Sequence, residues 1–177
     1  KSQNLEKLIK RTLDKSVNLY AESFLHLLGS LLNGTTVRAD ALKSMQKYWT
    51  DQGMDDEGVK LFDGSGLSPK NKMTAKAMSK VLYSIHKDSS LRDFHLSLQD
   101  VTKAGILSAR LSNVSALTDR YRLKSGSMEG VRCFAGYILE NGKPKYALVL
   151  MINSYSCSST EIRNKIADFL IHLSSVI

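Results

Sequence analysis

The spacing of apolar residues changes near residue 120, and this change limits the folds that the chain can adopt. Before it, apolar residues recur every three or four positions, as on amphipathic helices. After it, three segments (residues 120–127, 131–140 and 145–153) have the β-branched and aromatic content that is typical of strands. Asn141 and Gly142 separate the last two segments and form a strong hairpin signal. Helices that precede an antiparallel sheet predict an α+β fold, with the sheet flanked by helices.

Several local details of the sheet are also expected. Gly126 and Gly130 should bracket the turn between the first two strands, because glycine adopts positive φ readily. Residues 146–152 are apolar on both faces, which is typical of a central strand that is covered on both sides. A last helix should follow the sheet, with Ser159 or Thr160 as its N-cap.

Four helices are expected before the sheet. Their apolar stripes lie within residues 4–13, 19–31, 39–52 and 74–85. The second helix offers Ser16 or Asn18 as its N-cap, and the fourth offers Asn71 or Thr74, because short polar side chains accept hydrogen bonds from the first free amides of a helix. These helices, together with the loops between them, would make residues 1–119 mainly helical.

The connecting segments carry turn signals. Residues 59–62 are expected to form a short strand, and residues 63–69 are dense in turn formers. Residues 88–119 predict a loop-rich crossing, with short helical pieces around Leu96 and within residues 107–117. Neither repeats nor low-complexity segments interrupt the chain, so it is expected to form one unit.

Composition and charge narrow the classes of function. The 177 residues carry a net charge of +8, from 25 basic and 17 acidic side chains that are spread along the chain. Because the aromatic residues fall in core stripes, no nucleic-acid partner is expected. Cys133 and Cys157 suggest buried thiols, and with four well-separated histidines they predict no metal and no other cofactor. No apolar run approaches the ~20 residues of a membrane span.

Three short motifs follow one another along the chain. Ser16-Val17-Asn18 lies at an expected helix start, Asp63-Gly64-Ser65-Gly66-Leu67-Ser68 lies in the turn-rich segment, and Lys124-Ser125-Gly126 lies on the first strand. An ammonium and a hydroxyl can hold a carboxylate, and a glycine lets a substrate backbone lie close. The amide that follows is able to point at a developing oxyanion. Each motif also has a purely structural explanation, as a helix cap, a turn or a strand end.

In this order and spacing the motifs resemble those of the DacB-type D-alanyl-D-alanine carboxypeptidase/endopeptidases, the class C low-molecular-mass penicillin-binding proteins. Further segments are similar to that family: Gly105-Ile106-Leu107 with Arg110, Gly136-Tyr137 and Ile152-Asn153. The resemblance implies the α/β sandwich of the penicillin-recognising serine transpeptidases and β-lactamases. Residues 1–177 would be the C-terminal portion of one such domain. A three-stranded sheet and closing helix would occupy residues 120–177, and the N-terminal strands of the sheet would lie outside this chain.

The family's nucleophile lies in a Ser-x-x-Lys motif upstream of Ser-x-Asn, and the residues before Ser16 leave no room for it. Two such strings, Ser44 to Lys47 and Ser84 to Lys87, follow Ser-x-Asn on amphipathic helices. Neither is expected to be the nucleophile, because a catalytic serine is identified by the geometry and the roles of the residues around it, and not by a sequence string. The resemblance therefore implies that the nucleophile is not in this chain and that the fragment is inactive alone.

The resemblance also implies roles for the first two motifs. Ser16 would relay a proton to the leaving amine, and Asn18 would bind the peptide carbonyl of the substrate. The wall of the cleft would be shaped by four residues of the turn-rich loop: Asp63, Gly64, Ser65 and Gly66. For this loop the structural role is favoured over a catalytic one, because most of its residues are turn formers.

The third motif would hold the end of the substrate. Lys124 and Ser125 would bind its terminal carboxylate, and Lys124 would favour the neutral form of the upstream lysine by like-charge proximity. Gly126 would let the substrate lie close to the strand. The backbone amide of Ser127 would form half of the oxyanion hole, with the nucleophile's own amide as the other half.

The function implied is that of a serine-type, penicillin-binding D-Ala-D-Ala carboxypeptidase that acts on peptidoglycan stem peptides through an acyl-enzyme. Its partners would be stem peptides and β-lactams, and its location would be periplasmic or otherwise extracytoplasmic, in a bacterium. The alternative is a non-catalytic domain that binds wall peptides or acts as a scaffold. Because one sheet edge would lack its partner, self-association of that edge is a further expectation.

Overall fold

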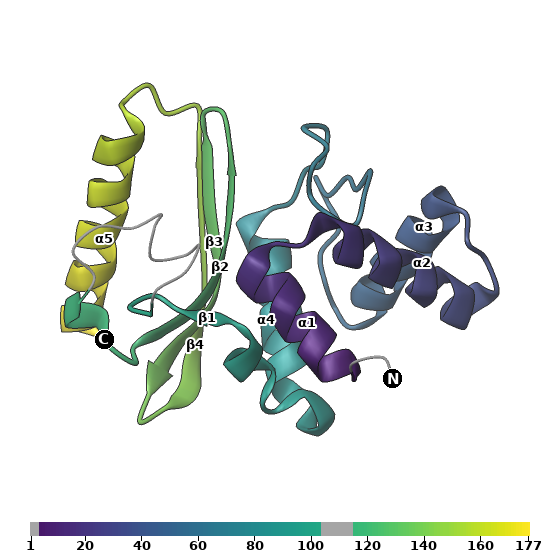
Figure 1. The fold of residues 1–177 in the computed structure, drawn as a ribbon, viewed down its shortest axis with the longest axis horizontal. Helices are drawn as coiled ribbons and strands as arrows, with labels where there is room; N and C mark the ends of the chain where they lie inside the picture. Colours follow the sequence, from purple (N-terminus) through teal and green to yellow (C-terminus); the bar gives the residue numbers. More distant parts are fainter. Residues whose placement is uncertain (1–3, 104–114) are drawn as a thin grey trace. The chain divides into compact units, whose positions relative to one another are not determined.

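The computed structural model describes residues 4–103 and 115–177, and the chain divides into two compact units. Residues 1–88 form the first unit, and residues 89–177 form the second. Figure 1 shows helices in the first unit and a sheet with a long helix on one side in the second. The segment from Gly105 to Leu107, and Arg110 after it, lie outside the described residues.

The described part of the first unit consists mainly of helices. They are α1 (Leu5–Lys15), α2 (Asn18–Asn33), α3 (Arg38–Asp51) and α4 (Ala75–Lys87). All four were predicted, with ends that differ by a few residues. One small core is shared by α2 and α3: Leu25, Ala41 and Leu42. A second joins α4 to the segment before it: Met54, Val59 and Ala77. The strand expected at residues 59–62 is reduced to one bridge, between Lys60 and Lys72.

The helix ends agree with the sequence prediction only in part. Thr74 caps α4 as predicted, because its side chain accepts a hydrogen bond from the amide of Ala77. The prediction that Ser16 or Asn18 caps α2 is wrong. Val17 occupies that N-cap and makes no side-chain cap hydrogen bond. Ser16 instead ends α1 in the left-handed conformation, with φ 50° and ψ 52°, and Asn18 is the first residue of α2.

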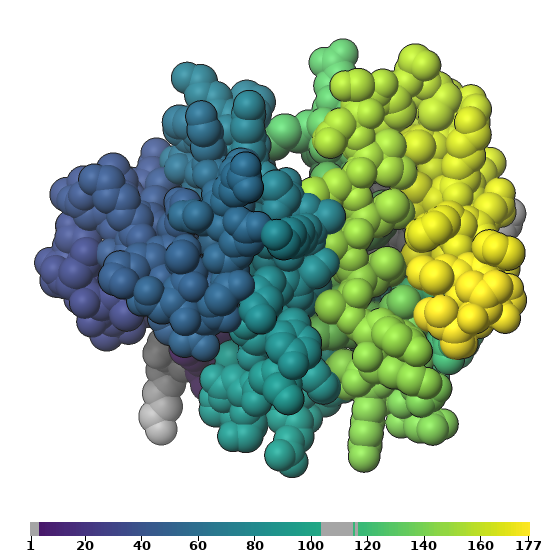
Figure 2. Space-filling model, turned by 180° about the vertical axis from the view of Figure 1, so that it is seen from behind, coloured from purple at the N-terminus to yellow at the C-terminus, as the bar shows by residue number. Residues whose placement is uncertain are grey.

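The second unit is built on one antiparallel sheet. Its strands lie in the order β1 (Gln99–Asp100), β2 (Tyr121–Met128), β3 (Val131–Glu140) and β4 (Lys143–Asn153). Helix α5 (Ser159–Val176) follows the sheet, and short 3-10 helices precede β2: η1 (Ser89–Leu91), η2 (Phe94–Ser97) and η4 (Ser115–Leu117). Figure 2 shows the yellow surface of α5 beside the yellow-green surface of β4. The α+β prediction is confirmed, and the two-residue β1 adds a fourth strand to the three expected.

The core of the second unit lies between α5 and one face of the sheet. Side chains alternate between the two faces of a strand, so every second residue of β2, β3 and β4 points toward α5. The buried side chains of this core include Tyr121, Leu123, Phe134, Ile138, Ile162, Ile166 and Leu170. The hydroxyl of Tyr121 donates to the carbonyl of Leu170 over 2.8 Å and so ties β2 to α5. Phe169, on the same helix, is 45% exposed.

Two predictions for the turn and the cap are wrong. Glu129 and Gly130, with φ 65° at the glycine, form the turn between β2 and β3, so Gly126 lies inside β2 rather than beside the turn. The N-cap of α5 is Ser158, whose side chain accepts a hydrogen bond from the amide of Glu161. Ser158 and Glu161 have the spacing of a capping box, which outweighs the neighbouring hydroxyl residues.

The second hairpin is confirmed, and its last strand ends the described sheet. Asn141 and Gly142 both have positive φ, 51° and 74°, as a two-residue hairpin turn requires. β4 is the last strand in the order of the described sheet. The strands that are expected to pair beside it, and so to make it central, would lie outside this chain. Residues 148–152 of β4 are apolar and only partly buried.

Candidate active site

The amide of Ser127 and the carbonyl of Ser125 point to the edge of β2 that faces away from β3. The direction follows from one hydrogen bond, which the amide of Leu139 donates to the carbonyl of Arg120 over 2.8 Å. Along an antiparallel pair, residues that exchange hydrogen bonds alternate with residues that do not. Even-numbered residues of β2 therefore bond to β3, and odd-numbered ones direct N–H and C=O to the other edge. In agreement, the ammonium of Lys124 donates to the carbonyl of Ser125 over 2.7 Å.

A strand covers only part of this outer edge of β2. β1 pairs with β2 at Arg122 and Leu123. Within residues 4–103 and 115–177, no strand pairs with residues 124–128 on that side. A sheet edge of this kind can receive an extended peptide as an additional strand, through main-chain hydrogen bonds. The ammonium at the same edge favours a peptide that carries a carboxylate.

Lys124 and Ser125 lie on opposite faces of the sheet. Ser125 is opposite Phe134 in the register, on the α5 face, and is only 8% exposed. Lys124 is opposite Ala135, on the other face. The structure therefore does not bring the Ser125 hydroxyl and the Lys124 ammonium onto one face of the sheet. What the two residues share is the outer edge of β2, which the Lys124 ammonium reaches at the Ser125 carbonyl.

Packing inside the sheet does not explain why residue 126 is a glycine. A Cβ at Gly126 would meet only the Cβ of Cys133, at 3.9 Å, which is an ordinary van der Waals distance. The φ of Gly126 also lies outside the positive region that favours glycine. The residue is exposed, so the missing side chain leaves room on the outside of the strand, where another molecule can approach.

Ser16 and Asn18 lie at the junction of α1 and α2. The amide of Ser16 donates to the carbonyl of Thr12, which closes the last turn of α1. A serine in the left-handed conformation is uncommon, and strained backbone of this kind clusters at functional sites. The chain becomes helical again at Asn18, so both side chains lie where α2 begins.

Asp63 organises the turn-rich loop. Its carboxylate accepts hydrogen bonds from the amides of Gly66 and Ser68, each over 2.6 Å, and from the side-chain amide of Asn71 over 3.0 Å. Burial alone would raise the pKa of Asp63, but these hydrogen bonds outweigh burial and hold the pKa below its ordinary value. Asp63 therefore closes the loop as a carboxylate anion, which agrees with a structural role.

Glu22, on α2, anchors this loop and was not among the predicted site residues. Its Oε1 atom accepts hydrogen bonds from the amides of Gly64 and Ser65, each over 3.0 Å. Gly64 lies so close to α2 that a Cβ there would be 2.9 Å from the Cβ of Leu25. Because Glu22 comes four residues after Asn18, about one helical turn, the loop docks on the helix that Asn18 begins. The four-residue spacing from Asn18 was the one feature of the sequence that could have indicated a role for Glu22 at the site.

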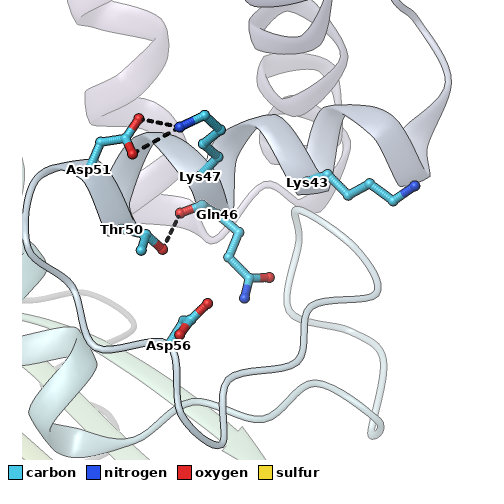
Figure 3. A pocket seen from close by; sticks show the side chains of 6 residues that line it. All are labelled: Lys43, Gln46, Lys47, Thr50, Asp51 and Asp56. Carbon is cyan, nitrogen blue, oxygen red and sulfur yellow. Dashed lines mark hydrogen bonds and ion pairs between the residues drawn. The ribbon is translucent and has the colours of Figure 1, made fainter.

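Neither Ser-x-x-Lys string forms a serine–lysine pair. The hydroxyl of Ser44 donates to the backbone carbonyl of Asp40 over 2.9 Å. The ammonium of Lys47 contacts both carboxylate oxygens of Asp51 at 2.9 Å (Figure 3). The hydroxyl of Ser84 donates to a backbone carbonyl over 3.3 Å. Both hydroxyls therefore donate to backbone carbonyls, and Lys47 forms an ion pair with Asp51.

The hollow beside α3 in Figure 3 contains none of the predicted site residues. It is lined by Lys43, Gln46, Lys47, Thr50, Asp51 and Asp56. In the parts of the chain that the structure describes, no group of three or more His, Cys, Asp or Glu side chains could hold a metal ion. Among the same residues, none of the helices combines the length and the apolar character needed to cross a membrane.

The predicted site residues fall into two sets. Ser16, Asn18 and residues 63–66 belong to the first unit, where α2 and Glu22 bring the loop and the Ser-x-Asn helix together. Lys124 and residues 125–127 belong to the second unit, where they share the outer edge of β2. Each set is held by contacts within its own unit.

Comparison with known proteins finds matches over nearly the whole chain. Residues 1–173 match the D-Ala-D-Ala carboxypeptidase 3 (S13) family. The penicillin-sensitive carboxypeptidase A of Dictyostelium discoideum is 30% identical over 144 residues, which are 80% of this chain and 27% of that protein. The D-alanyl-D-alanine carboxypeptidase DacB of Haemophilus influenzae is 31% identical over 178 residues, 96% of this chain and 36% of that protein. The predicted resemblance to the DacB type is confirmed.

Solved structures agree. The crystal structure of penicillin binding protein 4 (dacB) from Haemophilus influenzae matches with a TM-score of 0.80 at 26% identity, over 96% of this chain and 38% of that one. The same protein complexed with a β-lactam matches with a TM-score of 0.79. A predatory endopeptidase from Bdellovibrio bacteriovorus shares the fold, with a TM-score of 0.66 at 22% identity. The chain spans roughly a third of the length of the curated relatives, from 27% to 36%.

Proposed function

We propose that this chain, which belongs to the D-Ala-D-Ala carboxypeptidase 3 (S13) family, is part of a penicillin-binding, serine-type D-Ala-D-Ala carboxypeptidase or endopeptidase. Its substrate is a peptidoglycan stem peptide, which is cleaved through an acyl-enzyme. β-Lactams acylate the same serine, and the β-lactam complex of the Haemophilus relative supports this assignment. The observation that carries the proposal is the family match over residues 1–173.

In the proposed complex, the substrate lies along the outer edge of β2. The Ser127 amide, which points to that edge, donates to the carbonyl oxygen of the scissile bond as half of the oxyanion hole. Losing one such donor typically costs about 10²–10³ in rate. The Lys124 ammonium and the Ser125 hydroxyl approach this edge from opposite faces of the sheet and bind the terminal carboxylate there. Gly126 leaves room for the substrate backbone, in keeping with the lack of a packing reason for a glycine there.

The first unit supplies the remaining groups. Ser16 relays a proton to the leaving amine, and Asn18 binds the peptide carbonyl of the substrate. The strained backbone of Ser16 supports a functional role for this junction. Residues 63–66 shape the wall of the cleft, and the anchoring of their loop on α2 by Glu22 supports a common role with Asn18. Residues 1–177 then form part of one penicillin-binding domain.

The nucleophilic serine and its lysine are supplied from outside these 177 residues. The engagement of Lys47 by Asp51, and of the Ser44 and Ser84 hydroxyls by backbone carbonyls, supports this part of the proposal. In a Ser-x-x-Lys pair the lysine must be able to take the proton of the serine. Since the substrate belongs to the cell wall, the enzyme works in the periplasm or another extracytoplasmic compartment.

A fluorescent penicillin tests the proposal. We expect it to label a longer chain, in which a Ser-x-x-Lys segment precedes these residues, and not the 177-residue chain alone. Lys124→Ala should slow labelling of the longer chain by about tenfold or more, because the cation that attracts the carboxylate is lost. Labelling of the short chain would show that the nucleophile lies within it. A longer chain that is folded but never labelled would favour the alternative, a non-catalytic wall-peptide-binding or scaffolding domain.

The edge of β4 is expected to associate with a second copy of the chain. Residues 148–152 are apolar and partly exposed on the last strand of the described sheet, and such edges pair with other strands. Light scattering after size-exclusion should show dimers whose fraction rises with concentration. Ala147→Lys, at an exposed position of β4, should reduce that fraction, because a charged side chain disfavours edge pairing. A monomer at every concentration would contradict the expectation.

A further inference from the structure

Asp100, in the short strand β1, is a buried carboxylate that none of the proposed catalytic roles uses. Its side chain has no exposed surface, and its Oδ1 atom accepts hydrogen bonds from the amide and the hydroxyl of Thr102, over 2.9 and 2.7 Å. Its Oδ2 atom has no hydrogen-bond partner among the described residues and lies 3.7 Å from Nη2 of Arg122. Burial alone would raise the pKa of Asp100, but the bonds from Thr102 and the charge of Arg122 hold it below its ordinary value.

The pair of Asp100 and Arg122 lies next to Lys124. Asp100 is directly opposite Arg122 in the register of β1 and β2, so both side chains project from the same face. Lys124, two residues further along β2, projects from that face too. Lys124 is therefore the diagonal neighbour of Asp100. Diagonal neighbours on one face of a sheet are about 7–8 Å apart, within reach of long side chains and of their charges. The guanidinium of Arg122 is mostly buried, at 17% exposed, and it is turned toward Asp100 rather than to solvent.

We propose that Asp100, acting through Arg122, is a positioning residue for Lys124. Without Asp100, Arg122 would be a bare cation two residues from Lys124 on the same face. Like-charge proximity would then disfavour the charged form of Lys124 and push its ammonium away from the outer edge of β2. With Asp100 in place the pair is neutral, and Lys124 keeps its charge and its hydrogen bond to Ser125. This inference rests on the proposed function only for what the charge of Lys124 does in catalysis. Its test does not depend on that function.

Among the described residues of β2 and β3, the titratable side chains that neighbour Lys124 on this face, apart from Arg122, are uncharged near neutral pH. Cys133 and Tyr137 are the diagonal neighbours of Lys124 on β3. Burial raises the pKa of the Cys133 thiol, and it raises the pKa of Tyr137 to about 12, so both are uncharged at neutral pH. The side chain of Asp119 also helps to hold the pKa of Asp100 below its ordinary value. On β4, the positions that share this face are apolar across from Cys133 and Tyr137.

The test is the titration of Lys124 in the 177-residue chain, without ligand, followed by NMR of the lysine Cε resonances. Asp100→Asn should lower the midpoint of the Lys124 titration by about half a unit to one and a half units, because a nearby negative charge is lost. Arg122→Gln should raise it by a similar amount, and the double variant should return it close to the original value. All variants carry Cys133→Ser and Cys157→Ser, so that no thiol titrates in the same range.

Glu140→Gln is the matched control. It removes the partner of Lys145 at the far end of the sheet and should lower the midpoint of Lys145 while leaving that of Lys124 unchanged. An unchanged Lys124 midpoint in both Asp100→Asn and Arg122→Gln overturns the inference. If Asp100→Asn does not fold, Arg122→Gln decides alone, since a rise supports the inference and no change overturns it. The result is independent of penicillin labelling, so the two proposals can fail separately.

Discussion

Gly136→Ala should destabilise the second unit by more than about 3 kcal/mol, at the upper end of what overpacking costs. A Cβ at this position of β3 would lie 2.1 Å from the carbonyl oxygen of Arg122 and 3.0 Å from the Cα of Leu123. Both neighbours are backbone atoms of β2, so no change of rotamer can relieve the contact. β2 and β3 would have to separate just before Lys124. Urea denaturation followed by circular dichroism measures the loss.

Gly126→Ala is the matched control for this prediction. It adds the same methyl group to the neighbouring strand, where a Cβ would meet only Cys133, at 3.9 Å. Its urea midpoint should stay close to that of the original chain, because alanine fits an extended strand at least as well as glycine. In the longer, labelled chain the same variant should slow acylation, since the added methyl lies where the substrate backbone is proposed to pass. Equal midpoints for the two variants would contradict the role given to Gly136.

The sheet could be predicted where local residues decide its geometry. Asn141 and Gly142 force positive φ at two successive positions, and the hairpin they predict is present. The turn before it was misplaced, because Gly126 and Gly130 carry the same local signal. Only the pairing of Met128 with Val131 shows that Gly130 is the residue in the turn. Apolar residues on both faces of β4 predict a central strand, but this pattern does not say whether the neighbouring strand lies within this chain.

The site could be predicted as motifs but not as a network of contacts. Ser16, Asn18 and Lys124 were identified by local strings, whose predicted settings at a helix start and on a strand agree with the structure. Glu22 was missed as the anchor of the turn-rich loop, and Asp100 was missed as the ion-pair partner of Arg122. Glu22 bonds to amides that are 42 and 43 residues away, and Asp100 faces a strand that begins 21 residues later. No pattern within one helix or one strand encodes such pairings.

Glu22→Ala should release the turn-rich loop from α2. The carboxylate accepts two hydrogen bonds from backbone amides, and bonds to a charged acceptor contribute about 1.5–3 kcal/mol each. Since Glu22 is partly exposed, we expect a local loss of about 2–4 kcal/mol in total. Hydrogen exchange of the Gly64 and Ser65 amides should accelerate by about thirty-fold or more, because each 1.4 kcal/mol is a factor of ten. The amides within α4 should exchange at their original rates.

Two further variants separate charge from geometry in this anchor. Glu22→Gln keeps an acceptor oxygen and loses the charge, so its amides should exchange at intermediate rates. Arg38→Ala removes a cation 3.6 Å from Oε2 of Glu22, but Arg38 is 57% exposed and water screens the pair, so its effect should be small. Unchanged exchange in Glu22→Ala would mean that the packing of Gly64 on Leu25 holds the loop without the carboxylate. Slower penicillin labelling by a folded Glu22→Ala variant of the longer chain would tie the docked loop to the function proposed for Asn18.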